Sequence, residues 1–404
     1  MFRLLPAVAD PSALPLLQAR ALRALGDGYM AVLLPAYLLA TGLDMLAVGL
    51  ISTATMLGSA VATLAVGAWG HQVAGRRLLL WAAALMAATG LGFAGLAGFW
   101  PLLVVAFVGT LNPSSGDVSV FLPLEHARLA AAAQGPARTA LFARYSVTGA
   151  LCAALGALAA ALPDWAAQHF RIDRLAALRA MFVVYAGIGV VVALLYRRLP
   201  PDSASAHAAT PTHGALGPSR HIVWRLAALF SLDSFAGGLL VNAVLSIWLL
   251  ERFGFSLAQA GLFFFWTGLL GAASQLAAPW VAQRVGLLNT MVFTHLPANI
   301  CLVLAALAPN AAVALTLLFV RAALSQMDVP TRSAYVMAVV TPAERAAAAS
   351  FTAVPRSLAA AISPALSGAL LGLGYVALPL VACGGLKIVY DLALWRAMRG
   401  TRLD

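Results

Sequence analysis

Residues 182–196 read FVVYAGIGVVVALLY and residues 78–96 read LLLWAAALMAATGLGFAGL, and neither run contains a charged side chain. Each approaches the roughly 20 apolar residues that cross the hydrocarbon core of a bilayer as a helix. Neither run alternates between polar and apolar positions, as the strands of a membrane β-barrel do. The two runs therefore predict membrane-spanning helices.

The composition of the whole chain agrees with this prediction. Of the 404 residues, 62% are hydrophobic and only 10% are charged, whereas soluble domains contain about 25% charged residues. So few charges cannot cover a surface in water, and a backbone in lipid must satisfy its hydrogen bonds within helices or closed barrels. The sequence thus predicts an all-α membrane protein.

Apolar runs of spanning length occur about twelve times along the chain. The expected helices cover approximately residues 20–41, 45–69, 77–98, 101–124, 139–162, 175–196, 223–250, 257–282, 288–308, 312–340, 346–374 and 376–397. A segment rich in Pro, Ser, Ala and His interrupts the pattern halfway and is typical of a solvated linker. We therefore expect an N-terminal six-helix half (1–196), a linker (197–222) and a C-terminal six-helix half (223–404).

The formal charge of +11 comes mainly from arginines spread over short loops, which does not favour a nucleic-acid-binding face. If the N-terminus is cytoplasmic, the opposite side receives only Arg171, Arg174, Arg179 and Arg252. This asymmetry follows the positive-inside rule. It predicts a multi-pass membrane protein with both termini and the linker in the cytoplasm.

The two halves repeat weakly. GLIS begins at Gly49 and GLFF at Gly261, an offset of 212 residues (261 − 49), and Arg144 and Arg356 have the same offset (356 − 144). Parallel repeats of this kind are typical of transporters whose binding site lies between the halves near mid-membrane depth.

Two loops then resemble the loop signature of the major facilitator superfamily, Gly-x-x-x-Asp-Arg/Lys-x-Gly-Arg-Arg/Lys. The first copy, after the second expected helix, contains Gly67, His71, Gly75, Arg76 and Arg77, and the second, after the eighth, contains Gln283, Arg284 and Gly286. His71 and Gln283 stand where the signature has aspartate.

A third segment, MDVPTRSAY at 327–335 followed by PAER at 342–345, resembles the tenth helix of a bacterial group of uncharacterised facilitator permeases. The resemblance implies two pseudo-symmetric six-helix halves in the bacterial inner membrane and alternating access to a site for a small-molecule substrate.

Other function classes lack their motifs. The only lysine is Lys387, and no GxxxxGK[ST] phosphate loop occurs, which excludes nucleotide hydrolysis on this chain. No HExxH or GxSxG pattern occurs, and Cys152, Cys301 and Cys383 fall in separate apolar segments. We therefore expect no enzyme, no cofactor and no metal, and we assign His295 a structural role.

Ionisable side chains inside the expected helices are the candidate functional residues, because each costs about 2.5–3.5 kcal/mol on insertion scales. Asp27 and Asp233 are candidates for proton coupling; the alternative is that both are carboxylates at cytoplasmic helix ends. Arg321, Asp328 and Asp117 are candidates for substrate binding, with Arg321 suited to an anionic group.

Helix geometry also predicts ion pairs. Lys387 and Asp391 are four residues apart on one helix, which suits an intrahelical pair. Asp117 and Arg144 lie at matched depth on two arms of a hairpin, and Asp328 and Arg356 repeat the arrangement, so we expect both pairs to form and to brace or gate the carrier. Arg332, one turn beyond Asp328, competes for the same partner.

These observations predict a secondary transporter that exports a small organic molecule by proton antiport. Uptake of an organic anion with protons and a non-transporting receptor on the same fold are the alternatives. The expected partners are the substrate, protons and the lipid bilayer, with no nucleic acid, and the protein is expected to act as a monomer.

Overall fold

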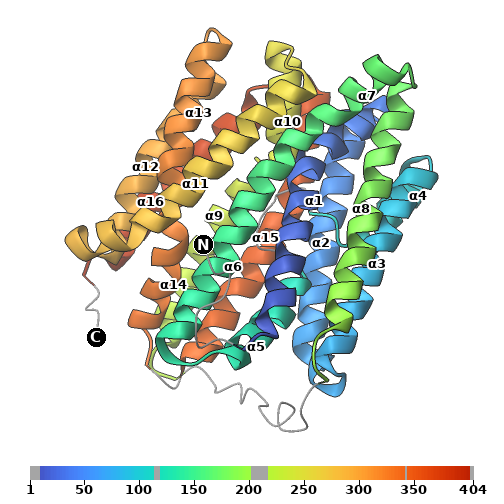
Figure 1. Ribbon diagram of the computed structural model, residues 1–404. Coiled ribbons are helices and arrows are strands. Elements are labelled where there is room, and N and C mark those ends of the chain that lie inside the picture. The colour runs from blue at the N-terminus through green and yellow to red at the C-terminus, as the bar shows by residue number, and fades with distance from the viewer. Residues whose placement is uncertain (1–9, 113–118, 202–216, 342–343, 401–404) are drawn as a thin grey trace. The chain divides into compact units, whose positions relative to one another are not determined.

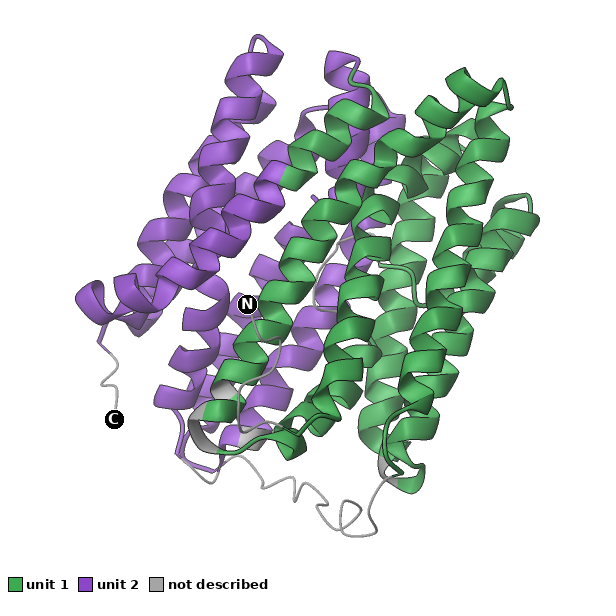
Figure 2. Ribbon diagram, in the orientation of Figure 1, with its two compact units in different colours: residues 1–210, 255–265 green, residues 211–254, 266–404 purple. Residues whose placement is uncertain are grey.

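The computed structural model describes residues 10–112, 119–201, 217–341 and 344–400. Within those ranges all regular secondary structure is helical (Figure 1). The chain forms two compact units, coloured separately in Figure 2: unit 1 contains residues 1–210 and 255–265, and unit 2 contains residues 211–254 and 266–404.

Unit 1 is built from eight α-helices and two short 3-10 helices of the first half of the chain. These are α1 (Ala13–Ala40), α2 (Met45–Trp69), η1 (Gly70–Gln72), α3 (Gly75–Gly95), α4 (Phe99–Val108), α5 (Phe121–Ala132), α6 (Gly135–Leu158), η2 (Ala159–Ala161), α7 (Leu162–Phe170) and α8 (Arg174–Arg197). Helix α1 packs mainly against α6, and α3 packs against α8. The α1–α6 contact is close because a Cβ atom on Gly28 would lie 2.1 Å from the carbonyl oxygen of Ala153.

Unit 2 is built from the remaining helices. These are α9 (Arg220–Gly238), α10 (Asn242–Phe253), α11 (Leu257–Val285), α12 (Leu287–Ala306), α13 (Ala311–Ser325), α14 (Asp328–Ala338), α15 (Arg345–Gly372) and α16 (Leu378–Met398). Helix α9 packs against α15, and α12 packs against α16. A Cβ atom on Gly238 would lie 2.3 Å from the carbonyl oxygen of Ala360, so glycine permits the close contact of α9 with α15.

The first turns of α11 belong to unit 1, although the rest of the helix belongs to unit 2. A Cβ atom on Gly261 would lie 2.3 Å from the carbonyl oxygen of Ala157, so this end of α11 packs directly on α6. The sequence instead predicted two halves that are each continuous in the chain.

Ten described helices or helix pairs are long and apolar enough to cross a membrane. The α1 helix, which contains Arg20, Arg23 and Asp27, and the α4–α5 pair take the places of the other two predicted crossings. Large apolar side chains such as Trp100 and Leu276 are exposed at 72% and 65%, as expected for surfaces that contact lipid. The predicted all-α membrane class is confirmed.

Three predicted crossings are not continuous helices. The crossing expected at 101–124 ends as α4 at Val108 and resumes as α5 at Phe121, the one at 223–250 is interrupted between Gly238 and Asn242, and the one at 312–340 is interrupted after Ser325. In the last case Pro330 explains the break, because it has no amide hydrogen and its ring clashes with a helical carbonyl four residues earlier.

Candidate functional site

Two interrupted crossings of unit 2 supply the central carboxylates. Asp233 lies on α9 about one turn before that helix ends at Gly238, and Asp328 is the first residue of α14. At the first interruption the carbonyl of Leu239 accepts a hydrogen bond of 2.6 Å from Ser367 Oγ, which satisfies a backbone group that the broken helix leaves free. Interrupted helices are a common source of substrate and ion sites in transporters.

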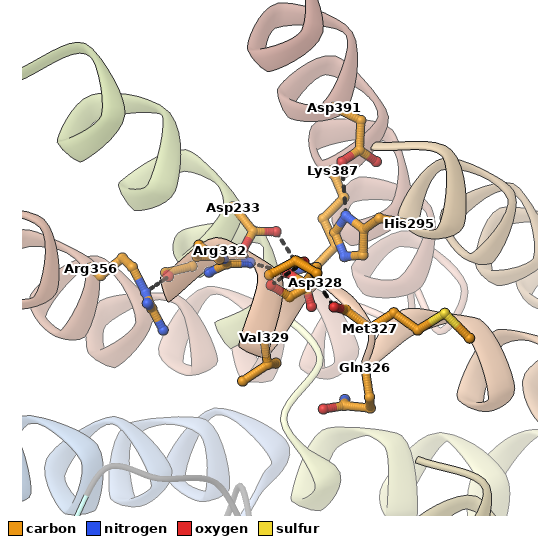
Figure 3. Close-up of polar contacts among 12 residues, drawn as sticks. Asp233, His295, Gln326, Met327, Asp328, Val329, Arg332, Arg356, Lys387 and Asp391 are labelled. Atoms are coloured by element: carbon orange, nitrogen blue, oxygen red, sulfur yellow. Dashed lines mark hydrogen bonds and ion pairs between the residues drawn. The ribbon is translucent and has the colours of Figure 1, made fainter. Parts of the chain in front are cut away.

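Asp233 is held between two cations, as Figure 3 shows. Its Oδ1 accepts from Lys387 Nζ of α16 at 2.6 Å, and its Oδ2 accepts from Arg332 Nη2 of α14 at 2.8 Å. Arg332 also donates to Asp328, four residues earlier on its own helix. All four residues are at most 8% exposed, so the network is a buried one in which each charge has an opposite charge.

The predicted partner of Lys387 is wrong. Lys387 bonds Asp233 on the neighbouring α9, while Asp391 pairs with His295 Nδ1 at 2.9 Å and accepts from Asn299 Nδ2 at 3.0 Å. The α12 helix therefore already supplies two partners to Asp391. Both His295 and Asp391 are buried, and the histidine has a bonded partner there.

Arg356 also has a different partner from the predicted one. Its Nε donates to Ser234 Oγ on α9 at 3.1 Å, and Asp328 bonds Arg332 instead. The sequence had named Arg332 as the competing partner, and an arginine one turn away on the same helix reaches the carboxylate more directly. In the first half Asp117 lies outside the described residues, so the predicted Asp117–Arg144 pair stays a prediction.

Arg321, on α13, has no carboxylate within ion-pair distance among the described residues, and its Nε is enclosed without an acceptor. Cys383 of α16 is the neighbour with which it interacts electrostatically. The predicted substrate-binding arginine is therefore a partly buried cation whose charge no described carboxylate balances.

Unit 1 has a buried cluster that the sequence did not predict. Glu125 of α5 accepts from Arg23 of α1, from the hydroxyl of Tyr145 on α6 and from the hydroxyl of Tyr196 on α8, the last at 2.6 Å. Glu125 is 0% exposed and Arg23 is 2% exposed. One carboxylate thus joins four helices. The sequence signal was weak, because Glu125 lies just outside the crossing expected at residues 101–124.

Asp27 lies one turn beyond Arg23 on α1 and is partly buried. Arg23 and Arg20 act on it electrostatically, and Tyr185 acts on it through a side-chain hydrogen bond. No described cation lies within ion-pair distance of it. The two candidate proton-coupling aspartates therefore differ, since among the described residues Asp233 has two ion pairs and Asp27 has none.

Arg76 of the first loop motif and Arg128 of α5 contact the beginning of the central linker. Arg76 donates to the carbonyl of Arg197 at 2.6 Å, and Arg128 donates to the carbonyl of Pro200 at 3.2 Å. Because the last carbonyls of a helix have no partner within the helix, Arg76 supplies one at the end of α8. Gly67 and Arg77 are exposed and Gly75 is partly buried.

In the second copy, the Arg284 guanidinium lies 3.8 Å from the centre of the Trp280 ring, and Gly286 adopts a φ of +87° that favours glycine. Gln283 is exposed. The side chain of His71 lies outside the described residues.

Glu344 holds the other end of the linker. Its carboxylate accepts from the amide of Gly217 at 2.6 Å, from Ser219 Oγ at 2.7 Å and from Thr341 Oγ1 at 2.6 Å. The Thr341 and Ser219 hydroxyls are the main groups that lower the pKa of Glu344 below its ordinary value. Across the described ranges, no group of three or more His, Cys, Asp or Glu side chains is arranged to hold a metal ion.

A family model described as the Major Facilitator Superfamily matches residues 16–364. An uncharacterised membrane protein of Saccharomyces cerevisiae is 24% identical over 412 residues, covering 92% of this chain and 91% of its own length. The nucleoside transporter NupG is 15% identical with a TM-score of 0.76, covering 97% of this chain and 100% of NupG. The xylose transporter XylE from E. coli, in an inward open conformation, is 15% identical with a TM-score of 0.72, covering 96% of each chain.

Proposed function

This chain belongs to the Major Facilitator Superfamily, and we propose that it is a proton-coupled carrier that moves a small organic molecule by alternating access, with Asp27 as the proton-carrying group. Transport across a membrane is the function of the solved structures that it resembles. The buried charged residues of this chain indicate which side chain carries the proton. Export by antiport remains the proposed direction, in the bacterial inner membrane with both termini cytoplasmic.

The observation that carries the proposal is the difference between Asp27 and Asp233. A carboxylate that binds and releases a proton must exist in both charge states at a tolerable cost. Protonating Asp233 would leave Lys387 and Arg332 with less negative charge, and an uncompensated buried charge is costly. Asp27 has no ion pair with any described residue, so its protonation breaks no salt bridge there.

The surroundings of Asp27 suit this role in a second way. Arg23, one turn away, is already bonded to Glu125. Arg23 therefore favours a negative charge on Asp27 without forming a salt bridge to it. Asp27 can consequently bind and release a proton while the Arg23–Glu125 bond stays intact.

The test uses purified protein in liposomes and the compound that most stabilises the protein in a thermal ligand screen, since ligands that bind the folded state raise its unfolding temperature. We expect Asp27→Asn to abolish accumulation driven by a pH gradient while leaving energy-independent exchange. Asp164→Asn is the control, because Asp164 belongs to an exposed pair with Arg174 in the same unit.

Uphill transport that persists in Asp27→Asn would remove Asp27 from the coupling mechanism. Loss of uphill transport only in Asp233→Asn, with exchange retained, would transfer the role to Asp233. The sign of the pH gradient that drives accumulation inside the liposomes separates antiport from symport.

A further inference from the structure

We propose that Arg356 recognises an oxyanion of the substrate, a carboxylate or a phosphate group. This inference rests on the proposed transport function and adds the chemical class of the cargo to it. Four features support it: the orientation of the guanidinium, the engagement of the nearby carboxylates, the charge balance of unit 2, and the depth of the residue in its helix.

The guanidinium of Arg356 is oriented by a single hydrogen bond. Its Nε donates to Ser234 Oγ at 3.1 Å, and neither terminal nitrogen has an acceptor among the described residues. Those two nitrogens are also not enclosed by protein atoms, unlike the Nε of Arg332. Figure 3 draws no bond from the Arg356 guanidinium to Asp233 or Asp328. Two parallel N–H donors on a fixed plane match the two oxygens of a carboxylate or phosphate.

The nearby carboxylates are already engaged. Asp233 and Asp328 interact electrostatically with Arg356, but Asp233 is bonded to Lys387 and Arg332, and Asp328 is bonded to Arg332. Neither forms an ion pair with Arg356. The hydroxyl of Ser234 is a neutral acceptor and cannot balance the charge of the arginine.

The charge balance of unit 2 indicates the sign of the missing partner. In the interior of its described helices, the cations are Arg321, Arg332, Arg356 and Lys387, and the carboxylates are Asp233, Asp328 and Asp391. Asp391 is engaged by His295. A cationic substrate would add to this excess of positive charge, whereas an anion would compensate it.

The depth of Arg356 suits a substrate site. It lies eleven residues beyond the start of α15 at Arg345, which is about 16 Å along a helix and close to half of a hydrocarbon core of about 30 Å. Its partner Ser234 precedes the interruption of the seventh crossing, which begins after Gly238. Transporters hold substrates at this depth beside discontinuous helices.

A purely structural role would be to brace α15 against α9. That contact is already close, because Gly238 lies against Ala360 and Ser363. Bracing through one hydrogen bond to a serine would also be served by a neutral side chain, whereas oxyanion binding requires the charge and is strongest with the two-pronged arginine. The two roles therefore predict different behaviour for Gln and Lys substitutions.

The experiment measures apparent dissociation constants with full-length protein in lipid nanodiscs. The probes are inorganic phosphate, benzoate, succinate, tetraethylammonium and glucose. We expect at least one oxyanion to bind. Loss of a charged, two-pronged interaction should then weaken that binding by about 10- to 100-fold in Arg356→Gln, with an intermediate loss in Arg356→Lys. Arg345→Gln is the matched control, because Arg345 is exposed on the same helix, and it should bind like the wild type.

Oxyanion binding that is equally strong in Arg356→Gln would overturn the proposal, as would a panel in which only the cation or the sugar binds. Arg356→Lys keeps the charge and covers the case in which Arg356→Gln does not fold. This experiment tests the oxyanion site separately from the proposal that Asp27 carries the proton. Binding that depends on Arg356 without pH-driven transport refutes the coupling proposal alone, and pH-driven transport of a cation that is indifferent to Arg356→Gln refutes this inference alone.

Discussion

The buried Arg23–Glu125 cluster makes the strongest stability prediction. Glu125→Gln preserves the shape of the side chain but removes its charge, so Arg23, which is 2% exposed, loses its carboxylate partner. Breaking one side of a buried ion pair costs about 3–5 kcal/mol. Since a unit of about 200 residues loses about 2–4 °C per kcal/mol, the unfolding temperature should fall by roughly 6–20 °C.

Two further variants give this prediction its controls. Asp164→Asn disrupts the Arg174–Asp164 pair of the same unit, whose side chains are 51% and 26% exposed, and exposed pairs contribute only about 0–1 kcal/mol. The double variant Arg23→Gln with Glu125→Gln removes both charges and keeps an acceptor for Tyr145 and Tyr196, so it should recover much of the loss.

The assay is thermal unfolding in nanodiscs followed by tryptophan fluorescence. The reasoning fails if Glu125→Gln lowers the unfolding temperature no more than Asp164→Asn does. It also fails if the double variant is as unstable as the sum of its two single substitutions, because a paired charge must show a coupling energy between its members.

Two other predictions concern the linker and the helix packing. The Thr341 and Ser219 hydroxyls lower the pKa of Glu344, so its ionised form stabilises the fold at pH values above the pKa of about 4.3 that glutamate has in an unfolded chain. The wild type should therefore unfold at a higher temperature than Glu344→Gln at about pH 7, and this difference should shrink as the pH falls to about 3. Gly28→Ala places a Cβ atom 2.1 Å from a carbonyl oxygen of α6 and should lower the free energy of unfolding by about 1–3 kcal/mol. Gly187→Ala brings its new Cβ within 4 Å of no atom of a neighbouring helix and should be neutral or stabilising by up to about 1 kcal/mol. Equal unfolding temperatures for these two variants would contradict the predicted packing clash at Gly28.

The helices could be predicted from the sequence because burial in lipid requires long apolar runs. The interruptions could not be predicted in the same way. Counting apolar residues detects the crossing at 312–340, but Pro330 in its interior gave the only local sign of a break after Ser325. In the seventh crossing the sign was the Gly237–Gly238 pair, and glycine alone does not distinguish a break from a packing contact.

The sequence singled out several buried charged residues but not their partners. Asp233, Asp328 and Arg332 were identified because charges inside apolar helices are rare, and the structure brings them together. Spacing within one helix suggested Asp391 for Lys387, yet the bonded carboxylate is on α9. Contacts between helices depend on how the helices rotate and pack, which spacing along one chain does not specify.

Because α11 belongs to both units, expressing the protein as two separate fragments would separate residues that pack together. A break in the polypeptide between Pro201 and Gly217 would preserve the Arg76 and Arg128 bonds in one fragment and the Glu344 bonds in the other. Residues 255–265, however, would be part of the second fragment although they belong to unit 1, where Gly261 packs against Ala157. The first fragment made by itself would expose that face of α6, so a split carrier should assemble when both fragments are co-expressed and not when each is folded alone.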